Sequence, residues 1–124
     1  MRTYRVFKKN FALEHYLREL PRALRAPFTR FRISAHTLAI ERGRYLKLPL
    51  EERTCSECPS KIEDEFHALI ECTKYDQHRR EAFKLIEQHC PTFHNMDDCD
   101  KFVFLLTMGG QINEITSKLV AKVL

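Results

Sequence analysis

Three cysteines and one histidine in the middle of the chain have the types and the spacing of metal ligands. Cys55 and Cys58 are separated by two residues, His67 follows after eight more, and Cys72 closes the set after another four. Zn²⁺ prefers four soft or borderline ligands in a tetrahedron, and a C-x2-C turn supplies two thiolates from one tight loop. The pattern C-x2-C-x8-H-x4-C therefore predicts one zinc site.

The expected zinc ion is structural. Four protein ligands fill the tetrahedron and leave no open position at which a water molecule could be activated. Three thiolates and one neutral imidazole around Zn²⁺ sum to a charge of about −1. In the alternative interpretation, the three cysteines are small buried side chains and His67 is a hydrogen-bonded core histidine. The spacing favours the ligand interpretation.

A short helix must position the second half of this site. Residues 62–70 predict a helix with acidic residues at its positive N-terminal end. Phe66 and Ile70 lie on its inward side, and Cys72 follows just past its end. We therefore expect this helix to hold His67 and Cys72 against the C-x2-C turn.

The remaining cysteines do not form a second pattern of this kind. Cys90, His94 and Cys99 lack a close cysteine pair, so no second metal site is predicted and their role stays open. An odd count of five cysteines, most of them assigned to a metal, suits a reducing compartment better than a secreted disulfide framework.

A second helix with a basic side is expected before the metal motif, between Pro21 and Gly43. Apolar residues spaced alternately by four and three positions predict its buried stripe: Leu24, Phe28, Phe31, Ala35 and Leu38. A polar row follows the same rhythm beside that stripe. Guanidinium groups bind phosphate oxygens through a planar fork of donors, which favours nucleic-acid contact over a merely solvated face. The candidate contacts are Arg22, Arg25, Arg30, Arg32, His36, Arg42 and Arg44.

The charge of the chain is divided unevenly. Residues 1–50 contain 12 Lys and Arg against three Glu and carry +9, whereas residues 51–124 contain 9 basic and 14 acidic residues and carry −5. A basic surface attracts polyanions, because neutralised phosphates release their counterions. RNA or DNA is therefore the expected partner.

Length and composition predict one mainly α domain. The chain has 124 residues, 44% of them hydrophobic and 31% charged, with only three Gly and five Pro, which excludes collagen-like and wholly disordered classes. Further helices are expected near residues 10–20, 76–89, 102–109 and 112–124. The expected architecture is a small helical domain with an embedded CCHC zinc knuckle.

Three segments are expected to pack as this one domain. Residues 1–50 form the basic helical segment, residues 51–75 the CCHC zinc-binding module and residues 76–124 the C-terminal helices. No apolar run approaches the ~18 residues of a membrane span, and no signal-peptide pattern opens the chain. We therefore expect an intracellular protein of the cytoplasm or nucleus, without a membrane partner.

No set of residues predicts an enzyme. Adjacent acids occur at Asp97 and Asp98, but they lie in a polar segment rather than after a strand, as two-metal chemistry would require. No Gly-rich phosphate loop and no nucleophile with its base is present in the sequence. Binding is therefore the expected activity.

Four stretches of the chain together resemble a known family. They are residues 30–45 (RFRISAHTLAIERGRY), 52–55 (ERTC), 62–67 (IEDEFH) and 72–75 (CTKY). This order resembles the zinc-binding CCHC region C-terminal to the polymerase domain in reverse transcriptases of non-LTR, LINE-type retrotransposons. The resemblance covers roughly residues 20–80.

The resemblance implies that Cys55, Cys58, His67 and Cys72 are the family's zinc ligands. It also implies that the module assists nucleic-acid handling by a larger polyprotein whose reverse transcriptase domain is a partner. The family's Tyr-x-Asp-Asp polymerase motif is absent from this sequence. Two alternatives stay open beside a nucleic-acid-binding module: a protein docking module for the missing polymerase portion, and an inert retroelement fragment.

Overall fold

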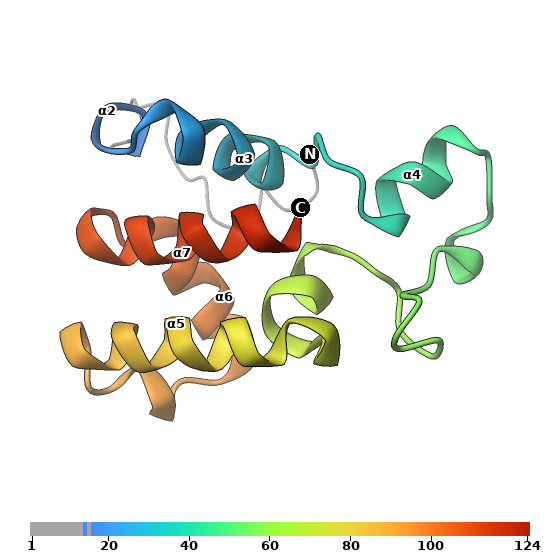
Figure 1. The fold of residues 1–124 in the computed structure, drawn as a ribbon. Helices are drawn as coiled ribbons and strands as arrows, with labels where there is room; N and C mark the ends of the chain where they lie inside the picture. Colours follow the sequence, from blue (N-terminus) through green and yellow to red (C-terminus); the bar gives the residue numbers. More distant parts are fainter. Residues whose placement is uncertain (1–13, 15) are drawn as a thin grey trace.

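Helices make up the fold of this computed structural model, which describes Glu14 and residues 16–124 (Figure 1). The α-helices are α2 (Tyr16–Glu19), α3 (Arg22–Arg32), α4 (Ala39–Tyr45), α5 (Asp76–His89), α6 (Asp98–Thr107) and α7 (Gly110–Val123). Short helical turns are η1 (Leu50–Glu52), η2 (His67–Glu71), η3 (Thr73–Tyr75) and η4 (Phe93–Asn95). The described residues include no strand beyond one isolated bridge. The predicted mainly α fold with an embedded Cys/His cluster is confirmed.

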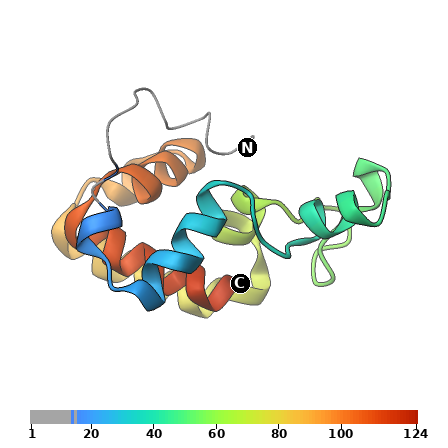
Figure 2. The same cartoon turned by 90° about the horizontal axis from the view of Figure 1, so that it is seen from above.

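Helix α7 forms the centre of the core. Figures 1 and 2 show it between α3 and α5, with α6 packed on a further side. Its apolar residues Ile112, Leu119, Val120 and Val123 are buried, and so is the polar Thr116. The Thr116 hydroxyl donates to the Ile112 carbonyl at 2.8 Å, which satisfies the hydroxyl inside the core.

None of the helices in the described part of the chain has the length and apolar character needed to cross a bilayer.

Residues 39–63, which we call the α4 lobe, project to one side of these packed helices (Figure 2). Glu63 joins the end of the lobe to its start. Its carboxylate accepts a hydrogen bond from the Ala39 amide at 2.6 Å, and its carbonyl accepts one from the Ile40 amide at 3.1 Å. The Arg53 side chain packs against α4 and donates to the Ile40 carbonyl at 3.2 Å and to the Leu48 carbonyl at 2.8 Å. A Cβ at Gly43 would lie 2.5 Å from Arg53 Cγ, so glycine is required for this close approach.

The single helix expected between Pro21 and Gly43 is wrong, because α3 ends at Arg32 and α4 begins at Ala39. Ser34 has φ of 61°, which breaks the helical path. Its hydroxyl donates to Glu65 Oε1 at 2.7 Å, so a residue from the metal loop holds the break in place. Ala35 is therefore exposed, although Phe28 and Phe31 are buried as the apolar pattern predicts.

The helices expected at residues 76–89, 102–109 and 112–124 are present, and the bounds of the last two are shifted. The helix of residues 76–89 has the expected bounds. Helix α6 begins earlier than expected, because the Asp97 carboxylate caps it by accepting from the Asp100 amide at 2.7 Å. Most of the helix expected at residues 10–20 lies outside the described residues, which show its end as α2.

Candidate metal centre

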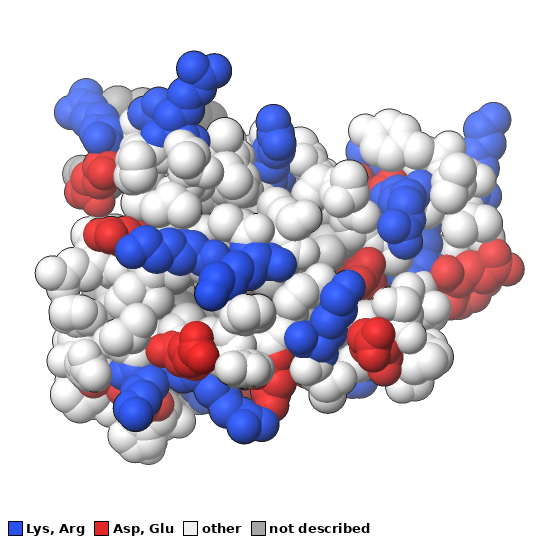
Figure 3. All heavy atoms as spheres, in the orientation of Figure 1, with Lys and Arg blue, Asp and Glu red and all other residues white. Residues whose placement is uncertain are grey.

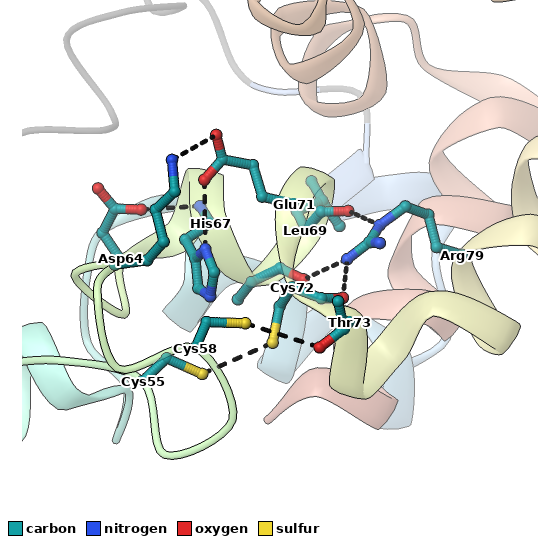
Figure 4. A network of polar contacts seen from close by, with 11 residues as sticks. Cys55, Cys58, Asp64, His67, Leu69, Glu71, Cys72, Thr73 and Arg79 are labelled. Atoms are coloured by element: carbon teal, nitrogen blue, oxygen red, sulfur yellow. Dashed lines mark hydrogen bonds and ion pairs between the residues drawn. The ribbon is translucent and has the colours of Figure 1, made fainter.

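Four side chains of residues 55–72 converge where the α4 lobe joins η2. Ligand atoms of Cys55, Cys58, His67 and Cys72 all lie within 4.8 Å of one another, and Figure 4 shows the three sulfurs and the imidazole facing a common point. Cys55 Sγ and Cys72 Sγ are 3.6 Å apart. Two thiolates bound tetrahedrally at about 2.3 Å would be separated by about 3.8 Å. The cluster therefore has the size of a metal site and can bind a metal ion.

His67 presents one ring nitrogen to this point and uses the other elsewhere. Its Nδ1 lies 3.2 Å from Glu71 Oε2, so in the neutral ring Nδ1–H donates to the carboxylate. Its Nε2 is buried without a hydrogen-bond partner among the described residues. A buried unsatisfied nitrogen is costly, whereas a metal would take its lone pair. This tautomer is the one that a metal-ligating histidine needs.

A small hairpin in residues 53–63 positions Cys55 and Cys58. Thr54 and Ile62 form an antiparallel bridge. The Cys55 amide donates to the Lys61 carbonyl at 2.9 Å, and the Lys61 amide donates to the Cys58 carbonyl at 2.9 Å. These bonds curl the chain between the two cysteines into one tight turn, so both thiols reach the same side.

A π-helical turn positions the other two ligands, where an ordinary helix over residues 62–70 was expected. Helical structure begins only at Glu65, and η2 contains His67. The Asp64 carboxylate accepts from the His67 amide at 2.8 Å and so begins the turn. The Cys72 amide then donates to the His67 carbonyl at 2.7 Å, spanning five residues. This wider turn brings the first and last residues of the segment to one site, and π turns are frequent at functional sites.

The buried thiol of Cys72 needs a nearby cation in order to lose its proton at neutral pH. Loss of solvation raises the pKa of its thiol to about 11. The pKa of the more accessible Cys58 is lowered by two hydrogen bonds from Thr73. The bond from the Thr73 backbone has the larger effect and the bond from its side chain the smaller one. At neutral pH the Cys72 thiol is therefore protonated when no metal is bound, and a metal must displace this proton. Metal affinity consequently falls as the pH falls.

Arg79 of α5 holds the end of η2, and the sequence analysis missed it. Its guanidinium donates to the Leu69 carbonyl at 2.9 Å and to the Cys72 carbonyl at 2.7 Å (Figure 4). Only 6% of Arg79 is exposed, and this burial lowers its pKa, while Asp76 at 3.3 Å opposes the shift. Carbonyl groups at a helix end need such donors. No local pattern marks Arg79, since charged residues surround it in sequence.

Replacing Glu71 by alanine is expected to weaken metal binding by about 10- to 100-fold, because a carboxylate bonded to a ligating histidine orients the ring and raises its basicity. Competition against a chromophoric chelator measures the change. Glu57→Ala is the control, since it removes an exposed acid beside the cysteines and leaves the contact of His67 Nδ1 with Glu71 in place. Equal affinities for the two variants would contradict this role of Glu71.

The candidate nucleic-acid contacts divide into exposed and buried side chains. Arg22, Arg30, Arg42 and Arg44 are exposed. Arg44 also pairs with buried Glu41 at 2.9 Å. Arg25 is half-buried and donates to the Leu17 carbonyl at 2.7 Å. The exposed arginines lie on α3 and on the α4 lobe.

Arg32 and His36 do not belong to an exposed basic row. Arg32 is 2% exposed, donates to the Leu106 carbonyl and pairs with Glu14 at 3.3 Å. The His36 side chain is 1% exposed, and its Nε2 lies 2.8 Å from Glu65 Oε1. The expectation that these two residues contact phosphate is corrected, because both side chains hold internal contacts instead.

The other cysteines stay outside the cluster. Cys99 and His94 are exposed, and Cys90 Sγ lies 3.4 Å from Thr92 Oγ1. They join no metal-ligating group within the described residues.

Comparison of the chain with protein-family models, curated proteins and solved structures gives no match. The site itself is therefore the basis on which a function can be proposed.

Proposed function

We propose that this chain is a nucleic-acid-binding module held together by one structural zinc ion, and that it assists a reverse transcriptase of the non-LTR type. The observation that carries the proposal is the convergence of three thiols on His67 Nε2, which has no hydrogen-bond partner in the described part of the chain. The chain binds the RNA or DNA backbone and carries no polymerase site of its own.

The donor set favours zinc. Three sulfurs and one imidazole nitrogen form a soft, four-coordinate group, which suits Zn²⁺ and does not suit Mg²⁺ or Ca²⁺, since these prefer oxygen. The ion would cross-link the small hairpin to the turn that follows it. Its role is to hold the α4 lobe, with its arginines, against the helical core.

The exposed arginines support backbone binding. Figure 3 shows Lys and Arg side chains over α3 and the α4 lobe, and further ones, with Asp and Glu among them, over α5 and α7. Arg22, Arg30 and Arg42 are exposed and form no ion pair within the described part of the chain. Such groups neutralise phosphates without reading base sequence. The four stretches that resemble the LINE-type CCHC region add support, because that region accompanies a polymerase that handles RNA and DNA.

Replacing Arg22, Arg30 and Arg42 together by alanine is expected to weaken binding equally for all sequences. Each lost phosphate contact lowers the slope of log K against log salt, so three contacts to a single strand reduce it by about 2. Fluorescence anisotropy with labelled 20-mers of RNA and DNA at several salt concentrations measures the slope.

The matched control removes the same number of charges elsewhere. Arg80, Lys84 and Lys118 are exposed on α5 and α7, and their triple alanine variant should keep nearly the original slope. Equal slopes for both triple variants would mean that binding depends on the net charge of the chain and not on Arg22, Arg30 and Arg42. The proposal is overturned if the zinc-loaded chain binds none of the oligonucleotides at low salt.

A further inference from the structure

Two adjoining hollows lie where the end of α3, the α4 lobe and the residue after α7 meet. The first has a volume of about 520 Å³, and its lining includes Arg30 and Tyr45. The second has a volume of about 320 Å³, and its lining includes Arg42. Thr37 and Leu124 line both hollows. The two hollows therefore adjoin, and we call the pair the groove, which extends from α3 to Cys55.

Internal contacts hold the floor of this groove. Segment 33–38 joins α3 to the α4 lobe (Figure 2), and its Ser34 and His36 line the first hollow. Both side chains bind Glu65 Oε1, at 2.7 Å and 2.8 Å respectively. His36 Nδ1 also accepts from the Leu38 amide at 3.3 Å. A ligand would thus meet a preorganised surface, which lowers the entropic cost of binding.

The charge along the groove is mainly positive. Arg30 lines one end, and Arg42 and Lys74 line the other. Glu63 is an acidic residue of the lining, but its carboxylate is engaged by the Ala39 amide at 2.6 Å. Cations at both ends of a groove suit a chain of phosphates rather than a single anion.

Tyr45 adds an aromatic surface to this basic groove. Its side chain is 76% exposed, the highest exposure among the large hydrophobic residues of the described chain. The Arg44 guanidinium lies over the ring at 5.3 Å from its centroid. An exposed ring backed by a guanidinium is a platform on which a nucleobase can stack, because every base has a π face.

We propose that this groove binds a single-stranded nucleic acid, with one base stacked on Tyr45 and flanking phosphates on Arg30, Arg42 and Lys74. The inference rests on the proposed function and adds the strand type and the binding site. Bases in a duplex are already stacked on each other, so a tyrosine platform selects unpaired bases. The groove lies beside Cys55, so the metal site supports one wall of it.

The first test compares Tyr45→Ala and Tyr45→Phe in the zinc-loaded chain. Anisotropy is measured with a labelled 12-mer as single-stranded RNA, as single-stranded DNA and as a duplex. Loss of the ring should weaken single-strand binding by about 5-fold or more, whereas phenylalanine keeps the stacking surface and should bind like the original chain. Duplex binding should change little in either variant.

A second measurement reports stacking directly. The chain has no tryptophan, so Tyr45→Trp places a single tryptophan in the groove, and its emission can be excited apart from that of the remaining tyrosines. Its emission should be quenched when the single strand binds. Leu85→Trp, at a 47% exposed position of α5, is the control and should keep its emission.

The outcomes separate this inference from the proposed function. Weaker single-strand binding by Tyr45→Ala, together with quenched emission in Tyr45→Trp but not in Leu85→Trp, supports the groove. If the arginine variants weaken binding while Tyr45→Ala binds like the original chain and Tyr45→Trp is not quenched, the groove is overturned and backbone binding stands. If no oligonucleotide binds the original chain, both proposals fail.

Discussion

Replacing Cys72 by serine is expected to abolish stoichiometric zinc binding and to unfold the hairpin of residues 53–63. A structural zinc contributes about 10–16 kcal/mol to the folding of small zinc-finger peptides, and a serine hydroxyl is a poor substitute for a thiolate. The hairpin has one bridge and few backbone bonds of its own. Isolated hairpins of this size are marginal in water, so the metal should decide whether it forms.

Two measurements check this expectation. Native mass spectrometry under reducing conditions should show one zinc per original chain and none for the variant. Hydrogen exchange should show that the amides of Cys55, Lys61 and Glu63 lose their protection, while those of α7 keep it. A strong chelator added to the original chain should give the same pattern.

Cys99→Ser is the matched control, because it removes an exposed thiol outside the cluster and should leave zinc and protection unchanged. Retention of one zinc by Cys72→Ser would show that Cys72 is not a required ligand. Full protection of the hairpin in a zinc-free chain would show that the metal is not structural.

Replacing Arg79 by methionine is expected to destabilise the domain by about 3–5 kcal/mol, since it leaves buried carbonyl groups without donors. Methionine keeps much of the length and the apolar stem, so the loss isolates the guanidinium. The midpoint of thermal unfolding should fall by about 10–20 °C in a domain of this size. Because Arg79 binds the Cys72 carbonyl at 2.7 Å, metal affinity should fall as well.

The neighbouring Arg80 provides the control for this prediction. Its side chain is 79% exposed and pairs with Asp76, which is 42% exposed. Exposed pairs contribute about 0–1 kcal/mol, so Arg80→Met should shift the midpoint by only a few degrees. Similar losses for the two variants would mean that the carbonyl contacts of Arg79 contribute little.

The metal site shows which parts of a site can be predicted from local pattern. The types and spacing of Cys55, Cys58, His67 and Cys72 indicated a metal cluster, because short loops confine where such side chains can reach. The π turn between His67 and Cys72 was not expected, since it depends on the Asp64 cap and on the Arg79 contacts. Arg79 itself was missed for the same reason.

The helix between Pro21 and Gly43 shows how long-range contacts override periodicity. Apolar spacing predicted one continuous helix, and it correctly marked Phe28, Phe31 and Leu38 as buried. The helix nevertheless breaks at Ser34, because Glu65 from the metal loop binds the side chains of the intervening segment. A pattern of nearest neighbours contains no information about that partner.

The sequence by itself determined the mainly helical fold, the bounds of α5 and the four members of the Cys/His cluster, because periodicity, helix stops and the spacing of possible ligands are local properties. Only the tertiary structure decided which basic residues face solvent. Arg32 and Arg30 have the same charge and lie two positions apart, yet Arg32 is buried against the Leu106 carbonyl while Arg30 lines a groove. Burial is set by contacts between residues far apart in the chain, and these exist only once the helices have packed.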